Sequence, residues 1–97
     1  MPFTYLLRCA DDSLYVGSTW DLERRLWEHN NEASGAAYTR HRRPVSLVWS
    51  VELPSIREAF FLEKQIQGWS RAKREALIRE DWEALPDLSS RPSARRQ

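Results

Sequence analysis

Residues 3–17 read FTYLLRCADDSLYVG, and this stretch decides the fold. Two runs rich in aromatic and aliphatic residues flank a short acidic turn, a pattern that predicts a β-hairpin. If Cys9 pairs with Ser13 across a three-residue loop, Tyr5 and Tyr15 project from the same face of the hairpin as diagonal neighbours. A two-residue loop would put the two tyrosines on opposite faces, and the sequence leaves both registers open.

The rest of the chain reads as helices with one further strand between them. Asp21 is a natural N-cap for a first helix, and Ser55 with Glu58 forms a capping box at the start of a second. Alternation of apolar residues between these helices predicts a third strand. We expect a helix over 22–30, a loop over 31–44, a strand over 45–53, a helix from 55 to about 69 and a second short helix over 71–80.

The composition is that of one small folded domain. The chain has 97 residues, of which 41% are hydrophobic and 30% charged, which excludes a chain that is disordered as a whole. Its single cysteine excludes an internal disulfide and any multi-cysteine zinc site, and we expect Cys9 to be a buried reduced thiol. Because no run approaches the ~20 apolar residues of a membrane helix and no signal peptide is visible, we expect a soluble cytoplasmic protein. The domain is expected over 1–85, with a flexible Arg/Ser/Pro-rich tail over 86–97.

The net charge is only +1, but the basic residues are clustered. Residues 24–43 carry five bases and two acids, and the last nine residues carry three Arg and no acid. Such basic islands permit nucleic acid as a partner without requiring it. Within the predicted loop, the candidates for contact with phosphates are Arg40, Arg42 and Arg43.

Glu63 is the most informative single residue of the sequence. It falls in the middle of the apolar face predicted for the second long helix, which is formed by Ile56, Ala59, Phe60 and Ile66. A carboxylate in such a position costs several kcal/mol if it stays charged and has no partner. Two interpretations stay open, a salt bridge to Arg25 or another base, and a ligand for a hard cation at the floor of a cleft.

Arg25 and His29 lie one turn apart, beside the apolar edge of the first predicted helix. Such a pair can present a guanidinium and an imidazole to the same anion, and the alternative is a solvated helix face. Arg24 and Glu28 are expected to point the other way. Tyr5 and Tyr15 can be read as core aromatics, but their hydroxyls still need polar partners.

Taken together, these residues resemble the signature of the GIY-YIG nuclease superfamily. The two halves of that signature are similar to Tyr5-Leu6-Leu7 and Tyr15-Val16-Gly17, and the remaining elements match Arg25, His29 and Glu63 at compatible spacing. The resemblance covers roughly residues 3–83. The stretch over 69–78 is similar to the small, stand-alone bacterial members of the UPF0213 type, which have no attached DNA-binding domain.

The resemblance implies a fold and an activity. The implied fold is α+β and resembles an α/β sandwich, with a small three-stranded antiparallel sheet flanked by helices. The implied activity is hydrolysis of DNA phosphodiester bonds with one divalent metal, Mg²⁺ or Mn²⁺, by a structure-selective or weakly sequence-specific endonuclease of DNA repair or processing. The implied partner is DNA with branched, nicked or single-stranded regions, and neither a membrane nor a small-molecule cofactor is expected.

The resemblance also implies a role for each candidate residue. Glu63 would hold the metal, and Arg25 would balance the charge that builds on the scissile phosphate. Tyr5 and Tyr15 would position or deprotonate the attacking water, and His29 would assist proton transfer. These roles suit the chemistry, which needs an acid for a hard cation and a fixed cation for the developing charge.

Two other functions remain open at the level of sequence. A nucleic-acid-binding module on a nuclease scaffold, with catalysis weak or lost, would use the basic loop and the Arg-rich tail without any reaction. A small interaction protein with no nucleic-acid role would fit the near-neutral net charge. Convergence of the five candidate residues on one open cleft would favour the nuclease.

Overall fold

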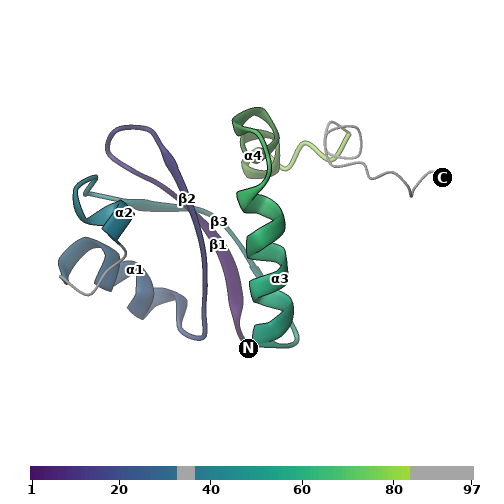
Figure 1. Cartoon of the computed structure of the whole chain (residues 1–97), viewed down its shortest axis with the longest axis horizontal. Helices are drawn as coiled ribbons and strands as arrows, with labels where there is room; N and C mark the ends of the chain where they lie inside the picture. Colours follow the sequence, from purple (N-terminus) through teal and green to yellow (C-terminus); the bar gives the residue numbers. More distant parts are fainter. Residues whose placement is uncertain (33–36, 84–97) are drawn as a thin grey trace.

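The computed structural model describes residues 1–32 and 37–83, which form a three-stranded antiparallel sheet with helices on both faces (Figure 1). The strands are β1 (Phe3–Arg8), β2 (Leu14–Thr19) and β3 (Ser46–Glu52), in the spatial order β2-β1-β3. The helices are α1 (Leu22–Asn31), α2 (Ala37–Arg40), α3 (Ile56–Gln67) and α4 (Arg71–Ile78). The predicted α+β fold with a three-stranded sheet is confirmed, and the tail predicted over 86–97 lies outside the described residues.

The hairpin adopts the register with a three-residue loop. Tyr5 lies opposite Gly17 and Leu7 opposite Tyr15, so the two tyrosines share one face of the sheet as diagonal neighbours. The backbone of Asp12, the last loop residue, is left-handed with φ 71°, a conformation that Asp tolerates better than most residues. The loop therefore fixes which side chains of β1 and β2 face the site.

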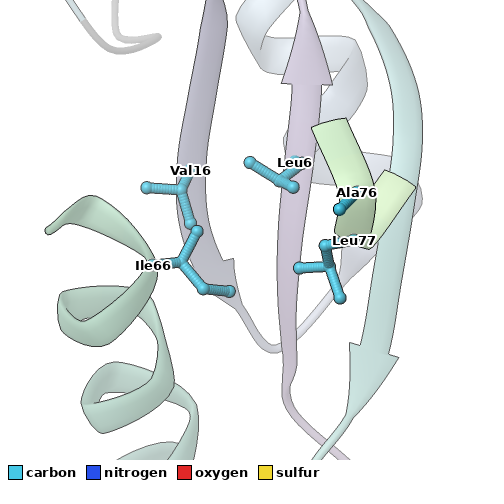
Figure 2. Packing of buried hydrophobic residues seen from close by; sticks show 5 residues of the cluster. All are labelled: Leu6, Val16, Ile66, Ala76 and Leu77. Carbon is cyan, nitrogen blue, oxygen red and sulfur yellow. The ribbon is translucent and has the colours of Figure 1, made fainter. Parts of the chain in front are cut away.

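Two apolar clusters cover the two faces of the sheet. On one face, α3 packs against β1 and β2, and α4 packs against β3. The buried residues of this cluster are Leu6, Val16, Ile66, Ala76 and Leu77 (Figure 2). On the other face, α1 packs through Leu22 and Leu26 onto a cluster of Tyr5, Leu7, Cys9 and Val45. Cys9 is 5% exposed, which confirms the buried thiol. No helix of residues 1–32 and 37–83 is both long enough and apolar enough to cross a membrane.

The predicted loop over 31–44 is wrong in one part, because it contains the short helix α2. A single turn is too short to show helical periodicity in the sequence, and its neighbours in space stabilise it instead. Thr39 is fully buried, and the ring of Tyr38 packs against Tyr15 with 5.8 Å between the ring centroids. The short helix thus lies against the same face as the tyrosines.

The apolar face of α3 is also rotated from the prediction. Phe60 was expected on that face, but its side chain is 51% exposed. The buried face is formed by Ala59 and Ile66, with Leu62 partly buried against the same cluster. Glu63 therefore lies at the edge of the buried face rather than in its middle, where water can still reach it. The helix itself ends at Gln67, two residues earlier than expected.

Candidate active site

The centre of the candidate site is the close approach of Tyr5 to Gly17. A Cβ atom on Gly17 would lie 2.5 Å from the hydroxyl oxygen of Tyr5, so only glycine allows the phenol ring to lie across β2. Tyr5 is 1% exposed and Tyr15 is half-buried, with 6.5 Å between their ring centroids. Of the two tyrosines, Tyr15 is thus the one that a bound molecule can reach.

His29 holds the hydroxyl of Tyr5 from α1. Its Nε2 lies 2.9 Å from the Tyr5 oxygen, and its Nδ1 lies 2.8 Å from Oγ1 of Thr39. Burial lowers the pKa of His29 to about 4, and the positive charge of Arg25 acts in the same direction, so the ring is neutral at pH 7. The expectation that His29 and Arg25 face the same anion is therefore wrong, because the imidazole is fully buried.

The tyrosine hydroxyls respond to the charges around them. Burial raises the pKa of Tyr5 well above its ordinary value, the neighbouring Tyr15 raises it further, and Arg25 acts in the opposite direction. Burial likewise raises the pKa of Tyr15, which Arg25 lowers and Glu63 raises. Both tyrosines are consequently neutral phenols at pH 7. Arg25 lowers and Glu63 raises the pKa of both tyrosines. Four of the five predicted residues therefore interact electrostatically.

Arg25 and Arg24 are directed differently from α1. The side chain of Arg25 is 27% exposed and that of Arg24 is 75% exposed. Glu28 bonds to both, at 2.8 Å from Nη1 of Arg25 and 3.1 Å from Nε of Arg24. The expectation that Glu28 points away from Arg25 is thus wrong, since its carboxylate bridges the two guanidinium groups. That carboxylate also fixes the direction of Arg25.

Glu63 is held by neutral partners. One carboxylate oxygen accepts a hydrogen bond from the hydroxyl of Ser18 at 2.6 Å, and the other accepts one from the amide of Gln67 at 3.1 Å. Within residues 1–32 and 37–83, Glu63 makes no ion pair, so the predicted salt bridge to Arg25 is absent there. Glu63 lies on the α3 side of the sheet and Tyr15 on the α1 side, and the site therefore wraps around the outer edge of β2.

Glu63 fits a hard cation as a single protein ligand. The described ranges contain no group of three His, Cys, Asp or Glu residues that could hold a metal by themselves. Mg²⁺ is usually bound by one or two carboxylates, and water and substrate phosphate oxygens complete its coordination. A half-buried carboxylate that accepts hydrogen bonds from two neutral donors has spare lone pairs for such an ion.

The basic residues after α1 have structural partners. Arg42 pairs with Asp11 at 3.1 Å and lies 4.0 Å from the centre of the Tyr38 ring. The guanidinium of Arg43 donates to main-chain carbonyls of His29 and Glu32 at the C-terminal end of α1. These donors of Arg43 stabilise the helix end, and its predicted contact with phosphates stays a prediction. Arg40 is exposed on α2, and the phosphate contacts of Arg40 and Arg42 stay predictions.

Three further residues of the site were not predicted from the sequence. They are Gly17 in its contact with Tyr5, Ser18 in its bond to Glu63, and Thr39 in its bond to His29. Strand alternation puts Ser18 on the same face as Val16, toward α3, which was an available signal. No pattern pointed to Thr39, because α2 itself was not predicted.

The hairpin with its two tyrosines, the arginine of α1 and the glutamate of α3 define the class of the protein. A family model described as the GIY-YIG catalytic domain matches residues 1–76, and the chain belongs to this family. Domains of this family are generally nucleases that act on DNA.

Several relatives of the chain share most of its length. It is 45% identical over 78 residues to a UPF0213 protein of Bacillus pumilus, covering 80% of this chain and 79% of that protein. It is 41% identical over 83 residues to a UPF0213 protein of Syntrophus aciditrophicus, covering 86% and 95%. The solution NMR structure of a UPF0213 protein from Bacillus halodurans is 35% identical, covers 97% of this chain and 98% of its own, and has a TM-score of 0.53. The name UPF0213 specifies no activity.

Proposed function

We propose that this protein is an endonuclease that hydrolyses DNA phosphodiester bonds and uses one Mg²⁺ or Mn²⁺ ion held by Glu63. The observation that supports the proposal is the placement of two candidate residues at the edge strand β2: Tyr15 belongs to this strand, and Glu63 accepts a hydrogen bond from its Ser18 at 2.6 Å. Arg25 acts on both tyrosine hydroxyls, and the charge of Glu63 reaches them from α3. An edge strand leaves this group of side chains open to a long substrate such as a DNA strand.

Each residue has a chemical role in this proposal. A cation bound at Glu63 would supply Lewis-acid polarisation of a phosphate oxygen. Arg25, fixed by Glu28, offers a stationary positive charge where negative charge grows on the phosphate. Tyr15, the more exposed phenol, orients the attacking water through its hydroxyl, while Tyr5 and His29 hold the surrounding structure in place.

The proposed substrates are DNA molecules with branched, nicked or single-stranded regions, as arise in DNA repair or processing in the cytoplasm. A domain of this size offers little surface for reading a long sequence, which favours selection by DNA structure. The phosphate contacts of Arg40 and Arg42 would hold the DNA backbone without selecting bases.

A panel of DNA substrates tests the proposal. The full chain is incubated with branched, flapped, nicked and single-stranded DNA in Mg²⁺, in Mn²⁺ and in EDTA, beside the variants Glu63→Gln and Arg25→Ala. We expect metal-dependent cleavage of at least one substrate, its loss in both variants, and normal activity of Arg24→Ala as the matched control. Cleavage that survives EDTA or Glu63→Gln would contradict the metal assignment.

A second candidate function is a module that binds nucleic acid without cutting it. The observation that favours it is the complete burial of Tyr5 and His29, with both ring nitrogens of His29 engaged inside the fold. Under this function, Tyr5 and His29 would serve the structure. Tight binding of DNA in EDTA, with no cleavage of any substrate in Mg²⁺ or Mn²⁺, would identify this function instead.

A further inference from the structure

Thr39 lies at the end of a chain of buried hydrogen bonds that leads to the candidate site. Its Oγ1 is 2.8 Å from Nδ1 of His29, and Nε2 of His29 is 2.9 Å from the hydroxyl oxygen of Tyr5. All three side chains are less than 2% exposed. These hydrogen bonds therefore link α2, α1 and β1 directly, with no water between the three side chains.

The direction of these hydrogen bonds follows from what each group can donate. Tyr5 is a neutral phenol, so its buried O–H needs an acceptor. Among residues 1–32 and 37–83, Nε2 of His29 is the acceptor within reach, since Arg25 has only donors. A neutral imidazole that accepts at Nε2 carries its proton on Nδ1, and that N–H donates to Oγ1 of Thr39.

We propose that Thr39 is a positioning residue of the candidate site, which holds His29 in the Nδ1–H tautomer and through it fixes the hydroxyl of Tyr5. This inference rests on the proposed nuclease function for its effect on activity. With its proton directed at His29, the Tyr5 oxygen keeps its lone pairs for Arg25, whose interaction with it lowers the pKa of the phenol. Loss of the Thr39 hydroxyl would leave the Nδ1–H of a buried ring without that acceptor. The Nε2–H tautomer would then compete, and Tyr5 would lose its partner.

The chain offers a matched control for the substitution. Thr4 is also fully buried, and its hydroxyl donates one hydrogen bond, to the main-chain carbonyl of Ala59 at 2.8 Å. Thr4→Val and Thr39→Val thus remove the same hydroxyl from equally buried sites, but only Thr39 contacts His29. Thr39→Ser keeps the hydroxyl and serves as the conservative variant.

The first test is the tautomer of His29, measured by ¹⁵N NMR of the imidazole in the full chain without DNA. The sequence has two histidines, so the variant His41→Gln leaves one ring to assign. We expect a protonated Nδ1 and an unprotonated Nε2 in the wild type, in Thr39→Ser and in Thr4→Val, and a shift toward the other tautomer in Thr39→Val. A wild-type ring protonated at Nε2, or an unchanged ring in Thr39→Val, would overturn the proposal even if no nuclease activity is found.

The second test is kinetic. Partners that orient metal-binding histidines typically change activity about 10- to 100-fold, and we expect a fall of that size in kcat for Thr39→Val with KM unchanged. Thr39→Ser should recover most of the activity, and Thr4→Val should keep it. A kcat in Thr39→Val equal to that of Thr4→Val would show that Thr39 serves stability alone. Absence of any wild-type cleavage would refute the proposed nuclease function and leave the result of the NMR test standing.

Discussion

The ring of Tyr5 lies against the backbone of β2 at Gly17, where a methyl group would meet the phenol oxygen at 2.5 Å. Gly17→Ala must therefore displace Tyr5 and stretch its bond to His29. We expect a loss of about 1–3 kcal/mol in the free energy of unfolding, the usual range for an overpacked core. Urea unfolding measures it, with Gly68→Ala as the control, because a Cβ there has only ordinary contacts at 3.5 Å and beyond. Equal stability of the two variants would contradict the close packing.

Arg25 and Arg24 are neighbours in sequence that differ in exposure. We expect Arg25→Ala to lower kcat by ~10²-fold or more, the size of one lost electrostatic contact in a transition state. Arg24→Ala should be nearly silent in the same assay, because its guanidinium lies in solvent. Equal losses at the two positions would mean that α1 presents a different face to the DNA.

Glu63 has neutral partners, and this determines what its removal does to stability. Glu63→Gln leaves no buried base without a counter-ion, so we expect the free energy of unfolding of the metal-free protein to change by about 1 kcal/mol or less. Metal-dependent cleavage should vanish in the same variant. A loss of ~3 kcal/mol with cleavage retained would instead assign Glu63 a structural role.

Substitutions of Arg43 and Arg40 distinguish two roles of the segment after α1, stability of the helix end and binding of DNA. Arg43 binds main-chain carbonyls at the end of α1, so Arg43→Ala should lower the free energy of unfolding by about 1–2 kcal/mol. Arg40→Ala should reduce the log–log salt dependence of DNA binding by about one unit. Chemical unfolding and binding titrations at several salt concentrations check the pair. An unaltered salt slope in Arg40→Ala would remove α2 from the DNA contact.

At the level of elements, the sequence predicted the parts whose stability is local. The hairpin, α1 and α3 carry their own turn and capping residues, and Asp21 and Ser55 cap as expected. The helix α2 could not be predicted, because contacts with distant residues hold it rather than its own periodicity. The prediction that Phe60 lies on the buried face of α3 was wrong for a related reason. Which edge of an amphipathic helix is buried depends on how the sheet underneath it twists.

The candidate site shows the same division. The resemblance to the GIY-YIG signature selected Tyr5, Tyr15, Arg25, His29 and Glu63 as a set. In the structure, the charges of Arg25 and Glu63 act on both tyrosines, and His29 is hydrogen-bonded to Tyr5. Burial of His29 could not be predicted from helix geometry alone, since Thr39, the hydrogen-bond partner of its Nδ1, comes from α2. The bond between Ser18 and Glu63 could not be predicted from the sequence either, because the two residues lie 45 positions apart on different elements.

At the scale of the whole molecule, acid should weaken the fold in two stages. His29 has a pKa of about 4 when folded and an ordinary value of 6.5, so the unfolded chain binds the proton more readily between these values. Stability is therefore complete above about pH 6.5 and falls as the pH drops toward 4, by up to about 3 kcal/mol. Urea unfolding at pH 7, 5.5 and 4.5 measures this fall. The variant His29→Gln should flatten it, and an equal slope in that variant would exclude His29 as the cause.

The second stage belongs to the contact between the hairpin loop and α4. Arg8 makes two bonds to Glu75, and Arg71 bonds to both Glu75 and Asp12. Bonding to Arg8 holds the pKa of Glu75 below its ordinary value of 4.5. This contribution is present above that value and is lost as the pH falls through the lowered pKa. The second stage should thus persist in His29→Gln.

The burial of Cys9 makes the reactivity of its thiol a measure of how often the hairpin opens. It is the only thiol of the chain, and burial raises its pKa, so an alkylating reagent finds little thiolate in the native state. Cys9 directly follows β1, the central strand, and its N–H donates to the carbonyl of Ser13 across the hairpin. Alkylation of Cys9 therefore requires the hairpin to separate at Cys9 and Ser13. The rate of labelling in native buffer would thus time the opening of the hairpin in the unmodified protein, with no engineered probe.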